Sequence, residues 1–218
     1  MRMTWFGHSC FRIETGASIV LIDPFLKGNP TFEGCGVPWD VATQDVTHVA
    51  LTHGHDDHKG DTAEICKAEG ASLFAVYELA MHLASEGVTN LEPMNAGGTV
   101  KSRDFDLTFV KAFHSSSSAG VYLGAPCGIV LTTREGKTVY HMGDTEIFSD
   151  MELIQELYAP HIGIVPIGDR FTMGARTAAL ACNKYFEFDE IIPCHYGTFP
   201  VIDKTADAFV RAMKGRNV

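Results

Sequence analysis

The chain has 218 residues, of which 45% are hydrophobic and 20% charged, and its formal net charge at pH 7 is −10. This composition is typical of a globular protein and excludes a disordered, collagen-like or coiled-coil chain. A strongly acidic chain has no overall basic field that could hold a phosphate backbone, so nucleic-acid binding is not expected. The length predicts one domain, residues 1–218, which can bury a core without a structural metal.

Neither a membrane span nor a secretion signal is predicted. No apolar run reaches the roughly 18 residues of a membrane span, and Met1–Thr4 lead into a mixed segment without a signal-peptide apolar region. A cytoplasmic location is therefore expected. The six cysteines are scattered without a CxxC pair, which predicts reduced thiols that are buried as small hydrophobic side chains. Cys194 is singled out because it directly precedes His195.

The first half of the chain opens with short strands and continues with strand–helix units. Gly7 and Gly16 mark tight turns between three antiparallel strands, and a loop over Asp23–Asp40 follows them. The predicted strands are Met3–Phe6, Cys10–Glu14, Ser18–Ile22, His48–Thr52 and Ser72–Val76, and the predicted helices are Asp61–Glu69 and Tyr77–Glu86.

The second half repeats this order. Its predicted strands are Phe105–Val110, Gly128–Thr133, Thr138–Met142, Ile162–Pro166 and Glu190–Cys194, and its predicted helices are Met151–Tyr158, Ala175–Phe186 and Asp203–Met213. Antiparallel strands followed by strand–helix units, twice over, predict an α/β fold. In this fold two mixed β-sheets pack face to face with helices outside them.

The segment Thr52–His58 combines three histidines with two aspartates directly after a hydrophobic strand. Residues i and i+2 of an extended chain point the same way, so His53 and His55 can reach one cation. Gly54 permits a sharp turn, and Asp57 and the neighbouring histidine, at the start of the next helix, are redirected towards a second point. A solvated polar loop is disfavoured because so many imidazoles without a cation stabilise nothing. The segment therefore predicts a metal site that can serve two ions.

The HxHxDH pattern, which stands here as His53, His55, Asp57 and His58, resembles the motif of the metallo-β-lactamase superfamily, and the resemblance covers the whole chain. It implies a four-layer αββα sandwich with two metal ions. The ligands that it implies are His53, His55 and His114 for one ion, Asp57, His58 and His195 for the other, and Asp144 with a water as the bridge between them.

Two further segments, Trp5–Phe11 and Leu21–Pro24, are similar to a branch of predicted metal-dependent hydrolases. This branch is related to ascorbate-phosphate lactonases and N-acyl-phosphatidylethanolamine phospholipase D. The resemblance implies that Asp23 holds a ligand imidazole, the alternative being a turn cap. It implies that His8 lines the pocket or supports a ligand, the alternative being a structural histidine.

Other polar residues are weaker candidates. Arg170 follows a strand and precedes a helix, so it can bind an anion or face the solvent. Ser115–Ser118 predict a flexible loop at the pocket edge rather than a nucleophile, because no GxSxG elbow frames them. The remaining histidines are expected to be structural, namely His48, His82, His141 and His161.

These features predict a hydrolase in which a hydroxide, formed from a metal-bound water of pKa about 7, cleaves a phosphodiester, lactone or amide bond of a small soluble substrate. Asp57 and Asp144 are the candidates for orienting that water or accepting its proton. Imidazole-rich ligation favours zinc, while manganese, nickel and iron also fit the ligand set.

Two other functions stay open at this point. An iron-dependent sulfur or oxygen oxidoreductase could use the same scaffold, although superfamily proteins with diiron redox sites usually have a glutamate where His55 stands. A metal-stabilised binding protein is the third alternative. The resemblance alone also implies a homo-oligomer.

Overall fold

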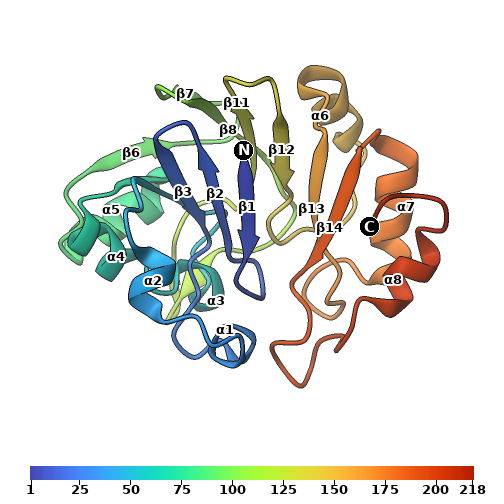
Figure 1. Ribbon diagram of the computed structural model, residues 1–218, viewed down its shortest axis with the longest axis horizontal. Helices are drawn as coiled ribbons and strands as arrows, with labels where there is room; N and C mark the ends of the chain where they lie inside the picture. The colour runs from blue at the N-terminus through green and yellow to red at the C-terminus, as the bar shows by residue number, and fades with distance from the viewer.

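The computed structural model describes all 218 residues and contains two six-stranded mixed β-sheets (Figure 1). In the first sheet the strands lie in chain order: β1 (Arg2–Trp5), β2 (Phe11–Thr15), β3 (Ser18–Ile22), β4 (His48–Ala50), β5 (Ser72–Val76) and β6 (Leu91–Met94). Strands β1 to β3 pair antiparallel, and β3 to β6 pair parallel.

The second sheet has the strand order β14-β13-β12-β11-β8-β7. Its strands are β7 (Thr99–Lys101), β8 (Phe105–Lys111), β11 (Cys127–Thr133), β12 (Thr138–His141), β13 (Ile162–Pro166) and β14 (Glu190–Cys194). Pairing is antiparallel from β7 to β12 and parallel from β12 to β14. Both sheets thus combine an antiparallel part with a parallel part, as predicted.

Eight helices accompany the sheets, and the larger ones flank their outer sides. Figure 1 shows α2, α4 and α5 on the left, beside the first sheet, and α6 to α8 on the right, beside the second sheet. The helices are α1 (Pro30–Gly34), α2 (Trp39–Thr43), α3 (Asp56–Lys59), α4 (Thr62–Glu69), α5 (Tyr77–Ser85), α6 (Met151–Tyr158), α7 (Ala175–Tyr185) and α8 (Asp207–Ala212). None of them combines the length and the apolar composition that a membrane span requires.

The second sheet is buried on both faces, which explains the layered architecture. Ile129 and Leu131 of β11 belong to the core between the two sheets, whereas Val130 packs in a second core with residues such as Ala178 of α7 and Phe209 of α8. Because neighbouring side chains of a strand point to opposite faces, one continuous apolar strand serves both cores. The predicted four-layer αββα sandwich is confirmed.

The prediction missed one edge strand of each sheet, namely β6 in the first sheet and β7 in the second. β6 contains Pro93, and proline is confined to edge strands because it has no N–H to donate to a neighbour. β7 is short and mostly exposed, so it lacks the apolar pattern of a strand.

The loop predicted over Asp23–Asp40 holds α1, which Asn29 caps, and the first residues of α2. The serine segment includes a small antiparallel ribbon of β9 (Ser117–Ser118) and β10 (Val121–Tyr122). The helix predicted from residue 203 to residue 213 is shorter than expected, since α8 covers only six residues.

Candidate metal centre

The HxHxDH segment follows β4 and runs into α3, as its sequence predicts. His53 lies in the extended connection, Asp57 and His58 lie on α3, and both histidines are fully buried. Gly54 is required between His53 and His55, because a Cβ atom there would lie 2.6 Å from the Leu123 side chain. This lack of a side chain lets the connection approach Leu123 closely.

Three distant residues reach the same place because they follow strands that run in one direction. His114 comes after β8, Asp144 after β12 and His195 directly after β14. β12 and β14 are both parallel to β13, and β8 and β12 are both antiparallel to β11. The carboxyl ends of these strands therefore meet at one edge of the second sheet, where ligand sites of α/β sheets commonly form.

Asp144 lies in the middle of the histidines. Its Oδ2 is 3.0 Å from His195 Nε2, 3.5 Å from His114 Nε2 and 4.0 Å from His53 Nε2. Its Oδ1 is 3.3 Å from His58 Nε2. The carboxylate thus faces four imidazoles that arrive from three different loops.

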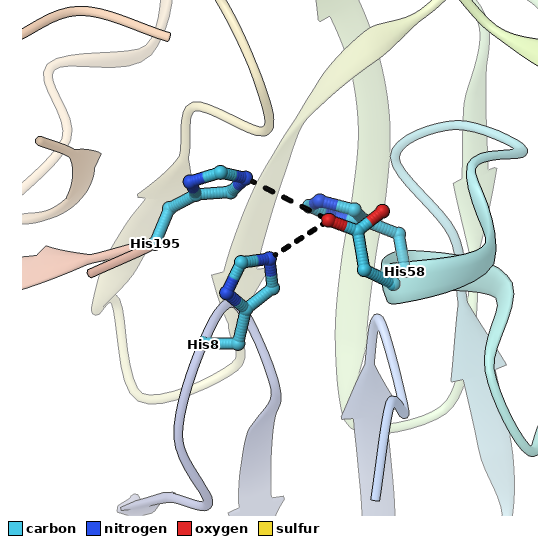
Figure 2. A group of neighbouring side chains, drawn as sticks. His8, His58 and His195 are labelled. Atoms are coloured by element: carbon cyan, nitrogen blue, oxygen red, sulfur yellow. Dashed lines mark hydrogen bonds and ion pairs between the residues drawn. The ribbon is translucent and has the colours of Figure 1, made fainter. Parts of the chain in front are cut away.

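Three groups of side chains have donor atoms close enough together to hold a metal ion. They are His53, His55 and His114; His53, His58 and Asp144; and His8, Asp57, His58 and His195. Figure 2 shows His8, His58 and His195 converging from the first loop, from α3 and from the end of β14. Imidazole and carboxylate are the ligands that first-row transition metals take in proteins.

Buried atoms without partners support the fit of these residues to cations. His58 Nε2 and Asp144 Oδ1 are buried, and neither makes a hydrogen bond. Unpaired buried polar atoms are costly and rare in folded proteins. Both atoms are of the kinds that bind metals, and they lie 3.3 Å apart, so a cation bound at this place would satisfy both.

Asp23 holds the outer side of the centre. Its Oδ2 accepts a hydrogen bond from His58 Nδ1 at 2.7 Å and another from the Thr52 hydroxyl at 2.6 Å, while its Oδ1 accepts the Thr52 N–H at 2.8 Å. Since the hydroxyl hydrogen of Thr52 goes to Asp23, Thr52 Oγ1 accepts from His53 Nδ1 at 3.0 Å. Both imidazoles thereby carry a hydrogen on Nδ1, which leaves Nε2 as the nitrogen that can bind a metal in the neutral form. The sequence pointed to Asp23, whereas Thr52 was missed.

His8 positions the Asp57 carboxylate. Its Nε2 lies 3.1 Å from Asp57 Oδ2, and its Nδ1 lies 3.0 Å from Thr198 Oγ1. A carboxylate can only accept, so His8 Nε2 carries the hydrogen. His8 is fully buried. Its partner Thr198 was missed, because no pattern in the sequence pointed to it.

The electrostatics of the centre favour neutral imidazoles at His53, His55 and His114 beside an ionised Asp144. Burial lowers the pKa of His53, His55 and His114, which keeps these three imidazoles in the neutral form that binds metals. Burial alone would raise the pKa of Asp144, but His195 and His58 outweigh it and hold the pKa well below its ordinary value.

The carboxylates also act on His58. Burial would lower the pKa of His58, but Asp144 and Asp23 raise it well above its ordinary value. No lysine or arginine pairs with Asp23, Asp57 or Asp144, whose only ionic neighbours are histidines. This concentration of negative charge without a basic partner is what bound cations would neutralise.

Three residues of the centre have strained backbones. The φ angles of His8, Asp23 and His195 are +51°, +46° and +56°, in the left-handed region that non-glycine residues seldom adopt. The His195 N–H donates to the His8 carbonyl oxygen at 3.0 Å, which ties the first loop to the end of β14. Strain of this kind persists only where surrounding contacts enforce it, and it clusters at functional sites.

A cavity of about 390 Å³ opens onto the centre. Its lining residues are His55, Asp57, His114, Ser115, Asp144, Phe171 and His195. Five of the seven predicted ligands therefore face a space in which a small molecule can bind.

A family model described as a β-lactamase superfamily domain matches residues 2–195. This chain belongs to the metallo-β-lactamase superfamily. A UPF0173 metal-dependent hydrolase from Methylocella silvestris is 52% identical over 222 residues, which cover 100% of this chain and 94% of the relative. A UPF0173 metal-dependent hydrolase from Chelativorans sp. is 54% identical over 222 residues, which cover 99% of this chain and 93% of the relative.

A solved structure agrees with these relatives. Igni18, a metallo hydrolase from the hyperthermophilic archaeon Ignicoccus hospitalis, matches with a TM-score of 0.87 and 33% identity, over 97% of this chain and 89% of its own. This member of the metallo-β-lactamase superfamily is accordingly a metal-dependent hydrolase, as the HxHxDH segment predicted.

Two further residues that the sequence singled out in this metallo-β-lactamase superfamily member, Arg170 and His141, lie outside the cavity. Arg170 is exposed and lies over the ring of Phe171, with 5.6 Å between its Cζ atom and the ring centroid, and it does not line the cavity. Its role in anion binding stays a prediction. His141 is structural, because its Nε2 donates to the Ser9 carbonyl oxygen at 3.0 Å and its Nδ1 accepts the Gly143 N–H.

The cysteines are buried with one exception. Cys10, Cys66, Cys127, Cys182 and Cys194 have at most 5% of their surface exposed. Cys35 is exposed, so the expectation of burial is wrong for this residue. The reason is local, since Cys35 directly follows the short surface helix α1.

Proposed function

We propose that this chain binds two divalent cations and hydrolyses a phosphodiester, lactone or amide bond of a small soluble molecule. The observation that carries the proposal is the central position of Asp144, within 4.0 Å of His53, His58, His114 and His195. A carboxylate in this position can be shared by two cations, and seven donors exceed the four ligands of one tetrahedral ion.

The donors divide into two sets. In the proposed centre, His53, His55 and His114 hold one cation, Asp57, His58 and His195 hold the other, and Asp144 belongs to both. The imidazole-rich set favours zinc, and manganese, nickel or iron would also fit it. Because the donors come from loops of both sheets, residues 1–218 are proposed to act as one catalytic domain.

When bound, the cations supply an activated water at neutral pH and polarise the carbonyl or phosphoryl oxygen of the substrate. Asp57 is the proposed acceptor of the proton from that water. Its Oδ2 is held by His8, its Oδ1 has no hydrogen-bond donor within the protein, and 28% of its side chain is exposed. Asp144 is almost fully buried and is better suited to holding cations.

The experiment combines metal analysis with a substrate panel. The purified protein is analysed for bound metals, stripped with a chelator, reloaded and assayed near pH 8 on bis-nitrophenyl phosphate, lactones and amides. His55→Ala and Asp57→Ala should each lower the rate at least about 100-fold. His82→Ala is the matched control, because His82 pairs with Glu86 on the surface of α5.

Two results would contradict the proposal. One is full activity with a single ion per chain and no gain on adding more. The other is a panel in which no substrate is turned over faster by the metal-loaded protein than by the stripped protein. The cytoplasmic location and the homo-oligomeric state remain predictions.

A further inference from the structure

The cavity over the centre continues on both sides. It shares His114 and Ser115 with a second cavity of about 440 Å³, and it shares His55 and Asp57 with a third cavity of about 500 Å³. A substrate whose scissile bond lies at the centre can therefore extend in two directions. The side chains of the two flanking cavities decide what these extensions can be.

The two flanks differ in chemistry. The second cavity is lined by Ser115, Ser116 and Ser117 together with small residues and Tyr122, and we call it the serine side. The third cavity contains Phe25 and Phe199, and we call it the phenylalanine side. The rings of these two phenylalanines stack with 6.2 Å between their centroids and an interplanar angle of 20°. Both flanks contain serine hydroxyl groups, since Ser117 lines both cavities and Ser118 lines the phenylalanine side, but the paired phenylalanine rings lie only on the phenylalanine side.

No lysine or arginine lines any of the three cavities. The phenylalanine side instead contains two carboxylates, Asp56 and Asp57. Asp56 Oδ1 accepts a hydrogen bond from Ser118 at 2.7 Å. A carboxylate or phosphate on an extension of the substrate would meet like charge there and no basic side chain.

We propose that the substrate carries an uncharged apolar arm, alkyl or aryl, which lies against Phe25 and Phe199, and an uncharged polar part on the serine side. This inference rests on the proposed function and narrows it, because it excludes substrates whose arms carry anionic groups. Each methylene buried on the phenylalanine side strengthens binding about fourfold, the equivalent of about 0.8 kcal/mol.

Alkyl hydroxamic acids test the arm separately from turnover, because the hydroxamate group binds metal ions and is the same in every probe. Binding to the zinc-loaded protein is measured by calorimetry for acetohydroxamate, hexanohydroxamate and adipic acid monohydroxamate. The last two have chains of equal length, but the adipic compound ends in a carboxylate. Hexanohydroxamate should bind at least about tenfold more tightly than acetohydroxamate. The adipic compound should bind no more tightly than acetohydroxamate.

Substitutions of Phe199 and Phe25 test whether the arm lies on the phenylalanine side. Phe199→Ala should reduce the preference for hexanohydroxamate to less than about threefold, since it removes one of the two rings from this side. Phe199→Lys should instead improve binding of the adipic compound, because it adds the missing cation. Phe25→Ala replaces the first variant if that variant fails to fold. Tyr77→Ala is the control, since Tyr77 is an exposed aromatic residue on α5 outside the three cavities.

The outcomes separate this inference from the proposed function. The inference of an apolar arm is wrong if the three hydroxamates bind equally well, or if the adipic compound binds most tightly to the unmodified protein. Neither result contradicts the proposed metal centre. If no hydroxamate binds and metal loading activates no substrate of the panel, the proposed function fails and this inference fails with it.

Discussion

Asp23→Asn tests whether the outer carboxylate sets the metal-binding form of His58. Asp23 is fully buried and accepts three hydrogen bonds, two from Thr52 and one from His58 Nδ1. Asparagine has nearly the same shape, and it tolerates the left-handed backbone, φ +46°, that Asp23 adopts. The substitution therefore changes hydrogen bonding and charge without straining the chain.

The expected effect on metal affinity follows from which nitrogen of His58 carries the hydrogen atom. With its one oxygen accepting the Thr52 N–H, asparagine presents an NH2 group to His58 Nδ1. His58 must then accept at Nδ1 and carry its hydrogen on Nε2, the atom that lies 3.3 Å from Asp144 Oδ1. A nitrogen that carries hydrogen cannot bind a metal, so affinity at this site should fall about 10- to 100-fold, or about 1.4 to 2.7 kcal/mol.

The assay is competition for zinc with a chromophoric chelator, followed by elemental analysis of the dialysed protein. The matched control is Asp61→Asn. The Asp61 carboxylate also accepts two backbone N–H groups, from Leu26 and Lys27, but it contacts no histidine of the centre. Asp61→Asn should keep the wild-type affinity for both ions. If Asp23→Asn keeps it as well, the argument that Asp23 sets the hydrogen position on His58 is refuted.

Three more outcomes are expected. Asp144→Ala should retain less than one metal ion per chain after dialysis, because a ligand shared by both sites is lost, and retention of two ions would contradict the shared role. Gly168→Ala should lower the free energy of unfolding in urea by about 1 to 3 kcal/mol, because its Cβ would lie 2.1 Å from the His195 carbonyl oxygen. Gly34→Ala, whose Cβ would meet nothing within 4 Å, should cost no stability, and equal losses would argue against the clash. Thiol titration should count one reactive cysteine, Cys35, in the native protein and all six after denaturation. More than one reactive thiol in the native protein would contradict the burial of the other five cysteines.

Short-range patterns made much of the centre predictable. His53, His55, Asp57 and His58 lie within six residues, and the i, i+2 spacing after a strand already aims two imidazoles at one point. The alternation of strands and helices likewise predicted the two mixed sheets, because it depends on the local periodicity of apolar residues. The edge strand β6 was missed because Pro93 and the exposed Glu92 break this periodicity.

The support of the centre depends on contacts between distant loops. Asp23 reaches His58 across 35 positions, and His8 reaches Asp57 across 49 and Thr198 across 190. No periodicity or spacing encodes these distances, because they arise only when the two sheets pack face to face and bring the loops at their ends together. The cavities arise in the same way, so the absence of lysine and arginine around the centre is a property of the folded chain and not of any segment. Sequence alone determined the layered fold and the residue types of the candidate ligands. Tertiary structure decided which side chains support these residues and which side chains line the cavities around them, because both depend on contacts between distant loops.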